Sequence, residues 1–116
     1  MWEQNKISVV LPVFNEEEGV KACIEEYFST NIVDEIIAVD NNSTDNSANE
    51  IKKTNAKYVK ENRQGYGAAL QRGLKEATGD IIFMSESDCT FIAKDIYKFL
   101  MYADEFDVIF GSRTSK

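Results

Sequence analysis

The chain has 116 residues, and its 13 basic and 20 acidic side chains give a formal charge of −7. This length predicts one compact domain, and the 43% hydrophobic and 11% aromatic content favours a folded chain over a disordered one. The acidic balance disfavours nucleic-acid binding, which depends on cationic side chains. The absence of histidine excludes a Ser-His-Asp triad and every histidine-ligated metal site.

Neither the apolar segments nor the cysteines indicate a membrane or zinc protein. The longest apolar stretch, residues 7–14, contains Ser8 and Pro12 and is shorter than the roughly 18 residues that a membrane span needs. No basic and apolar leader pattern opens the sequence. Cys23 and Cys89 are 66 positions apart without a C-x-x-C pair, so we expect two reduced thiols. These observations predict a cytoplasmic protein.

The predicted elements alternate between strands and helices. Residues 7–13 form a continuous apolar run, which is typical of a strand covered on both faces. Asn15 is a predicted N-cap, with three glutamates after it in the first turn of a helix whose apolar positions extend to Phe28. A second strand is predicted over residues 35–39, and a short helix over residues 47–53.

The same alternation continues to the end of the chain. The remaining predicted elements are a weaker strand over residues 57–60, a helix over 67–77, a strand over 81–84, a helix over 96–103 and a strand over 108–110. Gly79 is the predicted terminator of the helix before it. Such alternation predicts a parallel sheet with right-handed crossovers and helices on both faces.

Acidic residues follow three of these strands, and the carboxyl ends of parallel strands meet at one edge, where ligands bind. The acids are Glu16, Asp40, Asp45, Glu86 and Asp88. Like charges about 4 Å apart repel by roughly 4 kcal/mol at an effective dielectric near 20, so we expect lysines, arginines or a divalent cation to neutralise them. Glu86 and Asp88 suit Mg²⁺ or Mn²⁺, which would stabilise a diphosphate leaving group. A solvated turn is the alternative for this pair.

Two further segments are compatible with phosphate binding. Residues 63–67 precede a helix and could present backbone N–H groups, although a turn that needs glycine explains them equally well. Arg113 follows the last strand and is either a phosphate ligand or an exposed arginine. The loop after the first strand lacks the G-x-G-x-x-G pattern, and no G-x-x-x-x-G-K segment occurs, which argues against a dinucleotide oxidoreductase and a P-loop protein.

Four segments together resemble the nucleotide-sugar half of the family-2 glycosyltransferases, nearest the dolichol- or polyprenyl-phosphate sugar transferases. They are ISVVLPVFNE at residues 7–16, EIIAVDNNSTD at 35–45, NRQGYGAALQRGLKEATGDIIFMSESD at 62–88 and FDVIFGSR at 106–113. The resemblance implies the GT-A fold, a three-layer α/β architecture with a mainly parallel, doubly wound sheet of strand order 3-2-1-4 plus a fifth strand. It also implies that residues 1–116 form a single domain without the acceptor-binding half.

The resemblance also implies a set of binding residues. The nucleotide-sugar-binding residues are Pro12, Val13, Asn15, Glu16, Asp40, Asn42, Arg63, Arg72, Glu86, Ser87, Asp88 and Arg113. Asp40 would contact the base or ribose, while Asn41 and Asn42 stand where Asp and Gly are usual. Glu86 and Asp88 fall on the D-x-D motif and would be the metal ligands, with Mg²⁺ or Mn²⁺ as the cofactor.

The residues and the resemblance indicate the same reaction. A sugar would leave a metal-bound UDP or GDP with inversion, and the acceptor would be a molecule such as a polyprenyl phosphate. The general base is expected outside this chain, so we expect weak or no transfer by the chain alone. A homo-oligomer is a further expectation, as is a location in the cytoplasm or at the cytoplasmic face of the membrane.

Other classes of protein remain open at this point. A non-catalytic regulatory domain of the phosphoacceptor type would share the wound sheet and the acidic edge. A nucleotidyltransferase would use the same edge, but it commonly has a glycine-rich, basic loop where this chain has three glutamates at residues 16–18. A relic domain would keep the fold and bind nothing.

Overall fold

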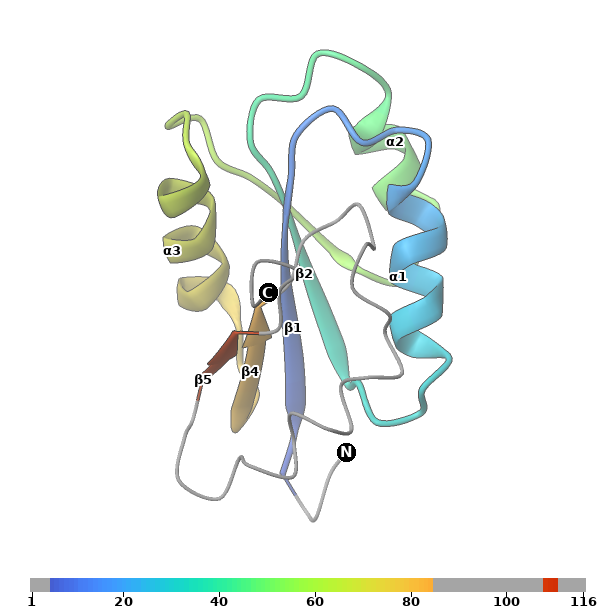
Figure 1. Ribbon diagram of the computed structural model, residues 1–116, viewed down its shortest axis with the longest axis vertical. Helices are drawn as coiled ribbons and strands as arrows, with labels where there is room; N and C mark the ends of the chain where they lie inside the picture. Colours follow the sequence, from blue (N-terminus) through green and yellow to red (C-terminus); the bar gives the residue numbers. More distant parts are fainter. Residues whose placement is uncertain (1–4, 85–107, 111–116) are drawn as a thin grey trace.

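The computed structural model describes residues 5–84 and 108–110 (Figure 1). Its strands are β1 (Ile7–Val13), β2 (Glu35–Asp40), β3 (Lys57–Lys60), β4 (Ile81–Met84) and β5 (Val108–Phe110). Its helices are α1 (Val20–Phe28), α2 (Ser47–Lys52) and α3 (Tyr66–Glu76). The five predicted strands are confirmed to within one residue, while the helix predicted over residues 96–103 lies outside the described residues.

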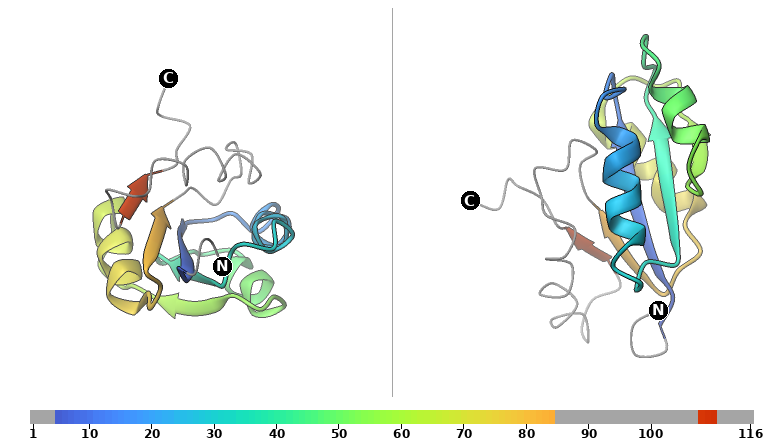
Figure 2. Two further views of the ribbon diagram at one scale, coloured as in Figure 1. Left: turned by 90° about the horizontal axis from the view of Figure 1, so that it is seen from below. Right: turned by 90° about the vertical axis from the view of Figure 1, so that its right-hand side faces the viewer.

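The strands form one parallel sheet in the order β3-β2-β1-β4-β5. This confirms the expected order 3-2-1-4 with a fifth strand, and the three-layer α/β fold. Helices α1 and α2 lie on one face of the sheet and α3 on the other (Figure 2). The loops that follow β1, β2 and β3 therefore meet at the carboxyl edge, at the top of Figure 1.

Two cores, one on each face of the sheet, explain why β1 is apolar at every position except Ser8. Val9, Leu11 and Val13 pack toward α1 and α2, whereas Val10 belongs to the core beneath α3. Successive side chains of a strand point to opposite faces, so a strand covered on both sides has no polar alternation. β1 is the middle strand of the sheet and pairs with β2 on one side and β4 on the other.

Helix α1 begins later than the sequence predicts. Its first residue is Val20, its N-cap is Gly19, and Asn15 lies outside the helix with a φ of 51°. The side chain of Asn15 accepts a hydrogen bond from the backbone N–H of Thr44 at 2.8 Å. Asn15 therefore joins two loops instead of capping the helix that follows it.

The end of α3 also differs from the prediction. The helix ends at Glu76, and Ala77 adopts an extended conformation after it, so Gly79 is not the terminator. A Cβ atom at Gly79 would lie 2.8 Å from the carbonyl oxygen of Lys6 and 2.9 Å from the nitrogen of Ser8. Glycine is needed there because the chain passes close to the start of β1.

The expectation of a reduced thiol is wrong at Cys23, which is buried in α1 and disulfide-bonded. Separation along the sequence does not limit which thiols a fold brings together. In the described part of the chain, no helix has the length and apolar character needed to cross a membrane.

Candidate functional site

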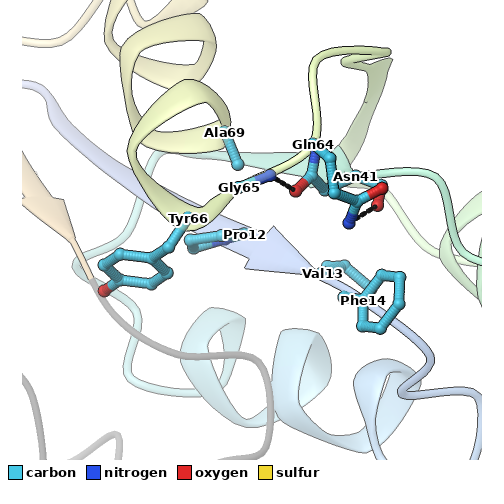
Figure 3. Close-up of a pocket in the computed structure, with 8 residues that line it drawn as sticks. All are labelled: Pro12, Val13, Phe14, Asn41, Gln64, Gly65, Tyr66 and Ala69. Carbon is cyan, nitrogen blue, oxygen red and sulfur yellow. Dashed lines mark hydrogen bonds between the residues drawn. The ribbon is translucent and has the colours of Figure 1, made fainter.

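An apolar pocket of about 230 Å³ lies at the carboxyl edge, between the end of β1 and the start of α3 (Figure 3). Its lining residues are Pro12, Val13, Phe14, Asn41, Gln64, Gly65, Tyr66 and Ala69. Phe14 and Tyr66 lie at opposite ends of it, and these two residues are 50% and 53% exposed. Exposed aromatic rings beside an apolar hollow offer flat contact surfaces to a planar ligand.

Asn41, the first residue after β2, connects the two sides of this pocket. Its backbone N–H donates to the carbonyl of Val13 at 2.8 Å, which attaches it to β1. Its side-chain nitrogen donates to the carbonyls of Glu61 at 3.1 Å and Arg63 at 2.7 Å. Its side-chain oxygen accepts from the N–H of Gly65 at 2.9 Å. The amide therefore holds the loop that follows β3, residues 61–65, against the end of β1.

The bond between Gly65 and Asn41 also bears on the phosphate hypothesis for residues 63–67. The N–H of Gly65 already has Asn41 as its acceptor, and Gly65 adopts a φ of 126°. That backbone conformation is accessible to glycine and strained for other residues. The structure therefore supports the interpretation of this segment as a turn that needs glycine.

Asp40, the last residue of β2, is 3% exposed and held by uncharged donors. One carboxylate oxygen accepts from the N–H of Ser43 at 3.0 Å, and the other accepts from the hydroxyl of Tyr58 at 2.7 Å. Burial and the adjacent Asp40 carboxylate raise the pKa of Tyr58 to about 12. Asp40 is thus fixed beneath the edge, next to Asn41, and is not among the residues that line the apolar pocket.

The loop after β1 is bonded to the loop after β2 at several points. The N–H of Asn15 donates to the hydroxyl of Ser43 at 3.0 Å, and the N–H of Glu16 donates to the hydroxyl of Ser47 at 2.8 Å. Asn42, with a φ of 63°, extends the connection to the loop after β3, because its side chain donates to the carbonyl of Asn62 at 2.7 Å. Three loops from three strands therefore form one bonded rim.

Among residues 5–84 and 108–110, no group of three acidic or cysteine side chains could hold a metal ion. The predicted gathering of acids stays a prediction, because two of its five members are not among these residues. Asp45 is stabilised by hydrogen bonds. Partial burial opposes its ionisation, but donors from Ser47 and Glu17 outweigh this and lower the pKa of Asp45. Glu86, Ser87, Asp88 and Arg113 lie outside the described residues, so their metal and phosphate roles stay predictions.

Arg63 and Arg72 lie beside a different hollow, a polar one of about 460 Å³ between α3 and the loop that follows β3. Both approach Glu61, whose carboxylate is 3.2 Å from the Nε of Arg63 and 3.6 Å from the guanidinium of Arg72. The N–H and guanidinium of Arg63, together with Arg72, lower the pKa of Glu61. Neither arginine lines the apolar pocket, and their contact with a diphosphate stays a prediction.

The pocket includes residues that the sequence analysis did not assign to a site. Pro12 and Val13, which were predicted to bind the nucleotide sugar, line the pocket together with Phe14 and Tyr66, which were not assigned to that role. An aromatic residue directly after a buried strand is a usable signal for Phe14, because that position lies at the carboxyl edge. Tyr66 has no comparable local signal, since its position depends on the turn at Gly65.

Comparisons with known proteins agree with this architecture. The model of the family "Glycosyl transferase family 2" matches residues 8–116. An uncharacterised glycosyltransferase of Mycobacterium tuberculosis is 34% identical over 108 residues, which cover 92% of this chain and 48% of the relative. The undecaprenyl-phosphate 4-deoxy-4-formamido-L-arabinose transferase of Proteus mirabilis is 31% identical, with 94% of this chain and 37% of the relative covered.

A solved structure also matches the fold. Glucosyl-3-phosphoglycerate synthase from Mycobacterium tuberculosis, in complex with Mn²⁺, UDP and glucosyl-3-phosphoglycerate, superimposes with a TM-score of 0.74 at 30% identity. The match covers 86% of this chain and 39% of that one. This chain therefore belongs to glycosyl transferase family 2, and it spans about half or less of the length of these relatives.

Proposed function

We propose that this chain is the donor-binding part of an inverting glycosyltransferase and that its apolar pocket receives the base of a nucleoside-diphosphate sugar. The observation that carries the proposal is the pair of exposed rings, Phe14 and Tyr66, at the two ends of an apolar pocket on the carboxyl edge. Ligands of wound parallel sheets bind at this edge, and a nucleobase is flat and stacks on aromatic side chains. Family membership favours this reading over a regulatory domain.

A divalent metal is part of the proposal. Glu86 and Asp88 would supply the hard oxygen ligands that Mg²⁺ and Mn²⁺ prefer, and the metal would neutralise the charge on the departing diphosphate. A related synthase was crystallised with Mn²⁺ and UDP, which supports this choice of cofactor. The proposed donor is a UDP- or GDP-linked sugar, and the proposed acceptor is a polyprenyl phosphate.

The proposal is tested by thermal unfolding of the chain with UDP, GDP or CDP, each with Mn²⁺ and then with a chelator. A ligand present at 100 times its dissociation constant should stabilise the fold by about 2.7 kcal/mol. We expect one of these nucleotides to raise the melting temperature, and the chelator to reduce the increase. No shift with any nucleotide would contradict the proposal and favour the relic domain.

A pair of variants locates the binding site. Phe14→Ala removes one of the two exposed rings and should weaken nucleotide binding about tenfold, because stacking on one aromatic ring contributes about 1–3 kcal/mol. Glu18→Ala changes an exposed residue of the same loop that does not line the pocket, and should bind as the wild type does. Equal binding by the wild type and Phe14→Ala would place the base elsewhere.

The cytoplasmic location also stays a prediction. Thiol labelling of the protein in freshly lysed cells would test it, because disulfides are rare in reducing compartments. A cytoplasmic location predicts labelling of Cys23, whereas an intact disulfide at Cys23, as in the structure, would contradict it. The oligomeric expectation is tested separately by sedimentation, where a clean monomer at high concentration would contradict it.

A further inference from the structure

Asn41 is buried at the junction of the two pocket walls, with an exposed fraction of 5%. One wall is the end of β1 with Phe14, and the other is Gly65 with the start of α3. Asn41 bonds to the first wall through its backbone and to the second through its side chain. Gln64 donates back to the carbonyl of Asn41 at 3.4 Å (Figure 3). Polar groups of a single residue therefore join both walls.

The side-chain bonds require an amide in this position. The two N–H bonds of the Asn41 side chain point to two carbonyl oxygens, those of Glu61 and Arg63, while its oxygen accepts from Gly65. An ionised carboxylate of the same shape has acceptors but no donor. It would keep the bond from Gly65 and place a negative oxygen against two carbonyl oxygens. The loss of two bonds and the new repulsion would weaken the attachment of the loop.

We infer that Asn41 is the positioning residue that sets the separation of the two pocket walls, and thereby how tightly a nucleobase fits between them. Both hydrogens of its amide nitrogen are used by the protein, so Asn41 acts through the loop and not by donating them to the ligand. The inference rests on the proposed function, because it presumes that the pocket holds a base.

The turn at Gly65 carries the effect from Asn41 to the aromatic ring. Gly65 is held by Asn41 in its left-handed conformation, with a φ of 126°, and Tyr66 follows directly as the first residue of α3. A shift of the loop therefore moves the Tyr66 ring relative to Phe14. Because the base would lie between these rings, its affinity should depend on Asn41 more strongly than the affinity of a ligand without a base.

The test compares Asn41→Asp with Asn55→Asp. Asn55 is an exposed residue between α2 and β3, outside the pocket. Asn55→Asp is therefore the same chemical change at a position that does not hold the loop at residues 61–65. Dissociation constants are measured by calorimetry for UDP, GDP, CDP and inorganic pyrophosphate, each with Mn²⁺. For the nucleotide that binds the wild type, we expect Asn41→Asp to weaken binding about tenfold, which is about 1.4 kcal/mol. We expect pyrophosphate to change less than twofold, and Asn55→Asp to match the wild type.

Hydrogen exchange of the peptide that covers residues 61–66 supplies the structural readout. Asn41→Asp should accelerate exchange there while leaving β1 and β2 protected. Unchanged nucleotide affinity in Asn41→Asp would overturn the inference, and so would an equal loss for the nucleotide and pyrophosphate, which indicates general destabilisation. If the wild type binds none of UDP, GDP and CDP, the proposed function fails. Faster exchange at residues 61–66 would then still support the role of Asn41 in holding this loop, and unchanged exchange would overturn that role.

Discussion

Tyr58 donates its hydroxyl from the edge strand β3 to the buried carboxylate of Asp40 on β2. Together with the N–H of Ser43, this bond gives both carboxylate oxygens of Asp40 an uncharged donor. A tyrosine at a half-buried edge position reads as a packing residue from sequence, and the neighbouring carboxylate becomes its partner through the pairing of β2 with β3. The raised pKa of Tyr58 therefore depends on the pairing of two strands and could not be predicted from the local sequence.

Replacing this hydroxyl should change both the stability and its pH dependence. Tyr58→Phe should cost about 2 kcal/mol at pH 7, because a hydrogen bond to a charged group is lost. Tyr58 ionises near pH 10 when unfolded and near pH 12 when folded. The advantage of the wild type is fully present below pH 10 and decreases as pH rises toward 12, because the unfolded state loses its proton first. Urea unfolding of both proteins from pH 7 to pH 11.5 measures this, and a difference that stays constant with pH would contradict it.

At the scale of elements, sequence predicts the strands better than the ends of the helices. β1 and β4 are short apolar runs, and this composition predicts that both faces of each strand are buried. The start of α1 was misplaced because Asn15 has its partner, Thr44, in another loop. The apolar pocket follows the same rule, since Pro12 and Val13 are the last two residues of a predicted strand. The contribution of Asn41 depends on carbonyls about 20 residues away in the chain.

Helix α3 packs against the sheet through a glycine. A Cβ atom at Gly73 would collide with the side chain of Val10, a stiff, fully buried residue of β1. Gly73→Ala should therefore destabilise the fold by about 1–2 kcal/mol, because overpacking outweighs the roughly 1 kcal/mol gain in helix propensity. Chemical unfolding at pH 7 measures the change.

Gly67 in the same helix is the matched control, because a Cβ atom there meets nothing within 4 Å. Gly67→Ala should stabilise the fold by up to about 1 kcal/mol. Destabilisation of equal size by both substitutions would show that the close approach of α3 to β1 is not the cause.

At the scale of the whole molecule, the chain matches half or less of each relative described above. We expect it to bind a nucleotide and to show no sugar transfer above the blank, because the general base and the acceptor site are expected outside it. Mass spectrometry of reactions with UDP-glucose or GDP-mannose, Mn²⁺ and a polyprenyl phosphate measures this. A nucleotide-dependent rise in melting temperature in the same preparation serves as the control for folding. Robust transfer would show that these 116 residues contain the general base.

The rim formed by three bonded loops has a consequence for the thermodynamics of recognition. Asn15, Asn42 and Gly65 each adopt a left-handed backbone conformation there, and hydrogen bonds between loops hold them in it. Immobilising a flexible side chain or loop on binding costs about 0.5–1.5 kcal/mol for each group. Here the folding of the sheet has already imposed most of that order, so an incoming ligand meets a preorganised receptor and loses little affinity to conformational entropy.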